Sequence, residues 1–150
     1  MVRRVAISTV LVGFVLLSTH APAMRAQTSP LRGAWQVTDG RAGLYIFAGT
    51  HYSMMAAAID RPDITDLTKA SRDELIALYG PMLGNAGVYE ISGNLVTIRP
   101  VVAKIPIVMK SGAYEVYEFK VEGDTLSLTQ RRNVRGPVTN GATTRLMRVE

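Results

Sequence analysis

The chain has 150 residues, no cysteine and a formal net charge of +5 at pH 7. Without cysteine it can form no disulfide and can carry no lipid-modified N-terminal cysteine. Its Lys and Arg residues are scattered among acidic residues, whereas nucleic-acid-binding proteins cluster their cations on one element. Composition and charge therefore argue against a disulfide-stabilised domain and against a nucleic-acid-binding protein.

The N-terminal segment has the layout of a secretory signal peptide. Arg3 and Arg4 precede a mainly apolar run over residues 5–17, and Ala21-Pro22-Ala23 places small residues at its exit. This run is too short for a stable anchor, because a transmembrane helix needs about 20 apolar residues. We expect cleavage after residue 23, with Ala26 as the alternative, and a periplasmic or secreted protein without stable membrane insertion.

We expect residues 24–30 to form a flexible leader and residues 31–150 to form one domain, since short β-favouring runs separated by Gly, Asn and Asp recur along it. Runs of this length and spacing predict an antiparallel sandwich or barrel. Apolar and polar residues alternate in several runs, which predicts one buried and one solvated face. The eight predicted strands are 33–38, 43–47, 51–57, 87–91, 95–103, 114–121, 125–130 and 143–149.

One helix is predicted between the third and fourth strands. Ser71 and Glu74 have the spacing of a capping box, in which each side chain bonds the other residue's backbone N–H. Leu75 and Leu78 follow at helical spacing and give the helix an apolar face, and Gly80-Pro81 ends it. We expect this helix to lie across an opening or a flank of the barrel.

Two turns have the same composition. Gly93-Asn94 and Gly123-Asp124 each separate two β-type runs. Gly adopts the positive φ that a tight reversal requires, and Asn or Asp tolerates it or bonds the nearby backbone. Both turns predict hairpins, whether through internal duplication or through shared turn chemistry alone.

Several motifs occur in a familiar order along the domain. They are Gly33-Ala34-Trp35, the Gly-Leu-Tyr-Ile-Phe run at 43–47, Tyr52-Ser53-Met54, the Gly-x-Tyr-x-x-x-Gly-Asn hairpin at 87–94 and the terminal Leu146-Met147-Arg148. In this order they resemble the bacterial lipocalin-like domain family, which is similar to the wider lipocalin and calycin barrels.

The resemblance implies an all-β fold, an eight-stranded, mainly antiparallel up-and-down barrel with one inserted helix. It also implies that Trp35 packs at the closed end of this barrel beneath Arg148, as a structural pair. The chain departs from secreted lipocalins because it lacks cysteine and because its helix lies between early strands rather than after the barrel.

The ionisable residues form no recognisable catalytic or metal-binding pattern. His51 is the only histidine outside the predicted signal peptide, and no zinc-binding spacing accompanies it. Ser53 lies two residues away, without the turn that a nucleophile needs. Asp60, Asp63 and Asp66 lack the spacing of a calcium-binding loop. We expect no enzymatic activity, no metal and no cofactor.

Tyr and Met residues on the predicted strands suggest either a ligand pocket or a filled core. Both side chains supply adaptable apolar surface with a few polar groups, as small-molecule pockets do, but a small barrel can also fill its interior with them. The candidate ligand-binding residues are Tyr45, Tyr52, Met54, Tyr89, Arg99, Glu115 and Tyr117.

Arg99 has two alternative placements. It can face the barrel interior and pair with Glu115, in which case a ligand carboxylate would displace Glu115. Alternatively, a bulge near Pro100 turns it out to water. An unpaired charge inside a barrel would cost several kcal/mol, so the first placement requires the pair.

Two functions are consistent with such a barrel. The first, which we expect from fold analogy, is binding of a small apolar or amphipathic molecule in an interior cavity of about 300 Å³ or more. The alternative is a protein-interaction or inhibitor-type barrel with a filled core and an exposed surface, built from residues 27–31 or 58–67.

Overall fold

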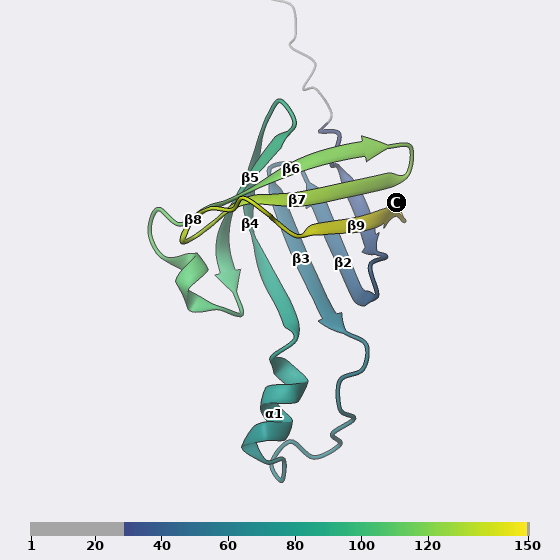
Figure 1. The fold of residues 1–150 in the computed structure, drawn as a ribbon, viewed down its shortest axis with the longest axis vertical. Coiled ribbons are helices and arrows are strands. Elements are labelled where there is room, and N and C mark those ends of the chain that lie inside the picture. Colours follow the sequence, from purple (N-terminus) through teal and green to yellow (C-terminus); the bar gives the residue numbers. More distant parts are fainter. Residues whose placement is uncertain (1–28, 150) are drawn as a thin grey trace, which may run out of the picture.

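One antiparallel sheet curls into a closed barrel in the computed structural model, which describes residues 29–149 (Figure 1). A helix, α1 (Arg72–Tyr79), lies between β3 and β4, and a 3-10 helix, η1 (Pro106–Met109), lies between β5 and β6. The strands are β1 (Gly33–Val37), β2 (Arg41–Ala48), β3 (His51–Ala58), β4 (Met82–Ser92), β5 (Leu95–Ala103), β6 (Glu115–Glu122), β7 (Thr125–Asn133), β8 (Gly136–Pro137) and β9 (Thr143–Arg148). The predicted signal peptide lies outside the described residues.

Strand order confirms the predicted eight-stranded up-and-down barrel. Consecutive strands from β1 to β7 pair with their neighbours, and β9 closes the sheet because it pairs with both β1 and β7. The two-residue β8 only extends the β7 hairpin. In Figure 1, β6, β7 and β9 cross β2, β3 and β4 at a steep angle. This closed meander is consistent with a calycin-like fold.

The two predicted hairpins are confirmed. Gly93 has a φ of 60° and Gly123 a φ of 57°, the left-handed region that glycine adopts without steric cost. β4 and β5 therefore meet at the pair Ser92 and Leu95, and β6 and β7 meet in the same way.

β4 differs most from its predicted bounds, since it begins at Met82 rather than at residue 87. Gly84 and Asn85 favour turns in isolation. Here they pair with Met55 and Met54 of β3 and are held in extended conformation. Pairing with a neighbouring strand outweighs the weak local preference.

Trp35 fills one end of the barrel. It is fully buried, and its Nε1 donates to the carbonyl of Leu31 at 2.7 Å. The Arg148 guanidinium lies 4.0 Å from the centre of the indole and donates to the carbonyl of Arg32 at 2.8 Å. A cation over an indole face is stabilised by about 0.5 to 2 kcal/mol, so the pair closes this end.

The barrel interior is packed with inward-facing side chains from all eight long strands and the segment before β1. The buried hydrophobic cluster comprises Leu31, Trp35, Val37, Tyr45, Phe47, Tyr52, Met54, Ala56, Tyr89, Val96, Ile98, Leu126, Leu128 and Leu146. Burial of these apolar side chains is the main favourable term for the fold.

α1 begins at the predicted capping box. Ser71 Oγ accepts from the N–H of Glu74, and the Glu74 carboxylate accepts from the N–H of Ser71 at 2.8 Å. The expectation that this helix lies across or beside the barrel is wrong, because none of its residues is buried and it projects beyond the barrel (Figure 1). The β3–β4 pairing continues to Ala58 and Pro81 and carries α1 away from the core.

Neither helix in the described part of the chain combines the length and the hydropathy needed to cross a membrane.

Candidate functional site

Most of the predicted ligand-binding residues point into the barrel. Tyr45, Tyr52, Met54, Tyr89 and Glu115 are buried, and Tyr117 is half-buried and packs against the core. They come from β2, β3, β4 and β6, strands that the closed sheet brings around one interior. We call this set, together with Asn85 and Gln130, the inner cluster.

Arg99 does not belong to the inner cluster. Ile98 and Pro100 on either side of it are buried, so strand alternation turns Arg99 to the outer face. There its Nη2 lies 3.7 Å from the carboxylate of Glu90. The expectation that Arg99 pairs with Glu115 inside the barrel is wrong.

The alternative expectation, that Arg99 faces solvent, is correct. Simple strand alternation turns it outward, and no bulge is needed. The irregularity in the β4–β5 register falls between Ala86 and Gly87, opposite the step from Pro100 to Val102. It therefore lies beyond Arg99 and leaves the alternation from Val96 to Pro100 intact.

The inner cluster is centred on a buried carboxyl group. The Tyr117 hydroxyl donates to Glu115 Oε2 at 3.3 Å, and Gln130 Nε2 donates to Glu115 Oε1 at 3.3 Å. These hydrogen bonds are long. Burial raises the pKa of Glu115, and burial together with the charge of this nearby carboxylate raises the pKa of Tyr52 and of Tyr117.

Three further polar atoms of the inner cluster are buried without a partner. Tyr52 Oη, Asn85 Oδ1 and Tyr89 Oη accept or donate no hydrogen bond among the described residues. Sequence reasoning missed Asn85, because residue 85 fell before the predicted start of its strand. The period-two spacing of Asn85, Gly87 and Tyr89, all buried, was the signal that could have found it.

Glu115, Tyr117 and Gln130 of the inner cluster lie toward the end of the barrel opposite Trp35, whereas Tyr45, another member, pairs directly with Trp35. Glu115 is the first residue of β6, whose far end at Glu122 pairs with Thr125. Thr125 in turn pairs with Met147, next to Arg148. Tyr117 and Gln130 are only half-buried, so the inner cluster is reachable from solvent at this end.

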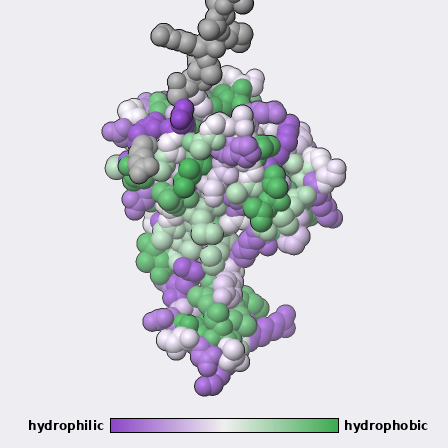
Figure 2. Space-filling view, turned by 180° about the vertical axis from the view of Figure 1, so that it is seen from behind, coloured by the Kyte–Doolittle hydropathy of each residue, from purple (hydrophilic) through white to green (hydrophobic). Residues whose placement is uncertain are grey.

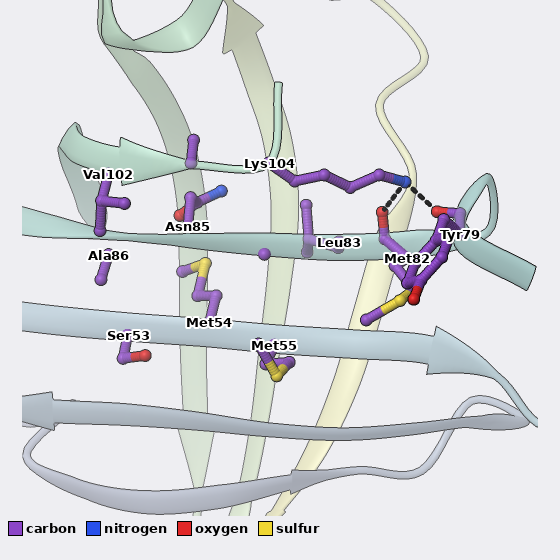
Figure 3. A pocket seen from close by; sticks show the side chains of 12 residues that line it. Ser53, Met54, Met55, Tyr79, Met82, Leu83, Asn85, Ala86, Val102 and Lys104 are labelled. Atoms are coloured by element: carbon purple, nitrogen blue, oxygen red, sulfur yellow. Dashed lines mark hydrogen bonds between the residues drawn. The ribbon is translucent and has the colours of Figure 1, made fainter. Parts of the chain in front are cut away.

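An apolar groove of about 590 Å³ lies on the outside of the barrel, and Met54 and Asn85 of the inner cluster also contribute to its lining (Figure 3). Gly84 and Ala86 on β4 are small and form its floor, while the larger Met55 and Val102 flank it on β3 and β5. Tyr79 at the end of α1 also lines it. We call this the outer groove.

Lys104 ties α1 to the edge of the outer groove. Its Nζ donates to the carbonyl of Tyr79 and to that of Met82 at 3.1 Å (Figure 3), and also to that of Gly80 at 2.9 Å. An ammonium group has three donors, and all three are used here. Lys104 therefore holds the fold together at this point rather than presenting a free cation.

The residues considered for catalysis or metal binding are dispersed. His51 begins β3, is exposed and has its Nδ1 3.2 Å from Thr50 Oγ1. Ser53 is also exposed on the outer face. Asp66 accepts from the N–H and hydroxyl of Thr68, at 3.0 and 2.6 Å. Within residues 29–149, no three His, Asp or Glu side chains converge as metal ligands.

Comparisons with protein-family models, with curated proteins and with solved structures find no match to this chain. Because barrels of one architecture serve many functions, the function has to be inferred from the inner cluster and the outer groove.

Proposed function

We propose that this chain is an exported barrel that binds a small amphipathic molecule in its interior, at the end near the inner cluster. The observation that carries the proposal is the set of buried, unpartnered polar atoms on Tyr52, Asn85 and Tyr89. The layout of residues 1–23 supports export.

Unpartnered polar atoms are costly in a core whose only role is stability. Each one costs about 1 to 3 kcal/mol relative to a satisfied group, and the large majority of buried polar atoms in proteins are paired. Phe or Leu would fill the same volume without this cost. Polar groups of a ligand that enters the barrel would supply the missing hydrogen bonds.

The surroundings of these atoms suit an amphipathic ligand. The Phe47 ring packs edge-on against Tyr89, with 5.3 Å between ring centres, and lies 6.5 Å from the ring of Tyr52. Met54 adds an adaptable apolar side chain. An apolar body would pack against these side chains while its polar group bonds the hydroxyls.

A neutral amphipathic fluorophore, N-phenyl-1-naphthylamine, tests the interior site. We expect saturable binding to the native protein and a loss of affinity of about fivefold or more in Tyr52→Phe or in Asn85→Leu, whichever loses the atom that accepts from the single N–H of the probe. Arg99→Met on the outer face is the matched control and should bind as the native protein does. Fluorescence titration measures all four affinities.

Two results would contradict the interior site. One is equal affinity in the native protein, Tyr52→Phe and Asn85→Leu. The other is an affinity that falls in Met55→Ser, which alters the outer groove while leaving the inner cluster unchanged.

A second candidate function is protein interaction through the outer groove. Met55, Val101 and Val102 are exposed on β3 and β5, and contiguous exposed apolar surface often marks an interaction site. Figure 2 shows further apolar surface on the lobe that α1 forms below the barrel. A probe that binds only in the outer groove would favour this candidate.

A further inference from the structure

Glu115 is an acid inside the barrel without a cationic partner. It is 8% exposed, and it takes part in none of the ion pairs between the described residues. Tyr117 and Gln130 donate to it, one to each oxygen, at 3.3 Å. A carboxylate has about four acceptor positions, so these long contacts leave it able to accept further donors.

Two arginines of the neighbouring strands, Arg99 and Arg132, lie on the other side of the barrel wall. Arg99 and Arg132 stack on the ring of Tyr114, at 5.4 and 4.6 Å from its centre. Tyr114 precedes Glu115 in the chain, and alternation places the two side chains on opposite faces of the sheet. These two cations therefore lie outside the barrel, while Arg41, in phase with Tyr45 on β2, is paired with Asp39.

Two tyrosines lie near the carboxyl group of Glu115, and one of them, Tyr117, donates its hydroxyl to it. Tyr52 and Tyr117 lie close enough for the charge of Glu115 to raise their pKa values, and Tyr45 lies close to Tyr117. A carboxylate attracts a cation through its charge, and a tyrosine ring adds to the attraction where the cation lies over its face. Tyr52 Oη, Asn85 Oδ1 and Tyr89 Oη also remain able to accept from N–H groups.

We infer that the ligand of the inner cluster is an organic ammonium ion that carries N–H groups, such as a protonated primary amine attached to an apolar body. The three N–H groups of the ammonium bond the Glu115 carboxylate and up to two of the free oxygens on Tyr52, Asn85 and Tyr89, and the apolar body packs on the rings. This inference rests on the proposed interior site and names the chemistry of its ligand.

Four probes of similar shape test the inference by calorimetry at neutral pH. They are phenethylamine, which is an ammonium ion; 2-phenylethanol, which is neutral; 3-phenylpropanoate, which is an anion; and trimethylphenethylammonium, a cation without N–H. We expect phenethylamine to bind the native protein at least about tenfold more tightly than 2-phenylethanol. The quaternary ion should bind less tightly than phenethylamine, and the anion more weakly than the alcohol.

Glu115→Gln should lose the preference for phenethylamine while retaining its affinity for 2-phenylethanol. Glu90→Gln, which removes an exposed carboxylate from the outer face, is the control and should keep the native preference. Circular dichroism establishes that both variants are folded. The comparison of the four probes on the native protein stands without either variant.

The outcomes separate the inference from the proposed function. Equal or tighter binding of 2-phenylethanol or 3-phenylpropanoate to the native protein overturns the ammonium inference and leaves the interior site standing. The ammonium inference is also overturned if folded Glu115→Gln still binds phenethylamine about tenfold more tightly than 2-phenylethanol. If none of the four probes binds the native protein, the interior site is itself refuted, and the inference with it.

Discussion

A single position in the β5 sequence separates an inward side chain from an outward one. Ile98 pairs with Glu115 across β5 and β6, and both face the core. Arg99, one residue later, faces solvent beside Glu90. Successive strand residues alternate between the faces of a sheet. Glu115 therefore shares the interior with Ile98 but not with Arg99, the residue that follows Ile98. Among the described residues, the Glu115 carboxyl group accepts hydrogen bonds from Tyr117 and Gln130, and a ligand would supply further donors.

The buried carboxyl group should make stability depend on pH. Burial raises the pKa of Glu115 above its ordinary value of 4.5, so the folded state holds this proton more tightly than the unfolded state does. The stabilising contribution is therefore complete below pH 4.5 and declines as the pH rises through the raised pKa. In Glu115→Gln this decline is absent, and the variant should gain stability relative to the native protein as the pH rises.

Urea denaturation from about pH 4 to about pH 8 measures this difference. Glu90→Gln serves as the control for loss of an acid on the surface. If the free energy of unfolding of the native protein and of Glu115→Gln changes in parallel with pH, burial does not raise the pKa of Glu115 and the prediction is wrong.

At the scale of elements, α1 depends on a residue from a distant strand. Its N-terminus carries its own capping box and acidic residues, but its last turn contains no basic residue. Lys104, directly after β5, provides the positive charge by donating to the carbonyls of Tyr79 and Gly80. Cations stabilise the C-terminus of a helix because its unpaired carbonyls carry partial negative charge.

Lys104→Met should loosen α1 while leaving the barrel stable. The variant loses the ammonium contacts that hold the end of α1, so amide hydrogens of α1 should exchange about fivefold faster, which corresponds to about 1 kcal/mol of local stability. Amides of β2 and β7 should exchange at native rates. Hydrogen exchange measures both, and Lys110→Met in the nearby loop is the control. Unchanged exchange in α1 would exclude the role assigned to Lys104.

At the scale of the whole molecule, the two ends of the barrel have different chemistry. Trp35 and Arg148 close one end with apolar packing and a stacked cation. The other end holds Glu115, Tyr117 and Gln130 of the inner cluster, and the β3–β4 pair that carries α1 continues past it. Closure through β9 requires no segment before Leu31, the first residue of the buried cluster.

Removal of the predicted signal peptide should therefore leave the barrel unchanged. Protein recovered from outside the cytoplasm should begin at Met24 or Gln27, as mass spectrometry can determine. A chain that begins at Met24 should unfold at the same temperature as the uncleaved chain, because all strands and core residues described lie after this position. An intact Met1 on protein held in a membrane fraction would contradict the prediction.

The sequence by itself determined the features that a few adjacent residues encode. Gly93 and Gly123 set the hairpins, since only a residue without Cβ takes their positive φ freely. Ser71 and Glu74 set the start of α1, because the capping box closes within one turn. Period-two alternation and the order of the motifs were enough to predict the barrel.

Only the tertiary structure decided the features that depend on a neighbouring strand. The alternation in β5 shows that its residues fall into two sets on opposite faces. Only the register of β5 with β4 and β6 decides which of the two sets is buried, and this register places Arg99 outside. Pairing with β3 likewise holds Asn85 in a strand and buries it. The inner cluster emerged only in part from the sequence, because its remaining members are brought together by strand register, which no short segment encodes.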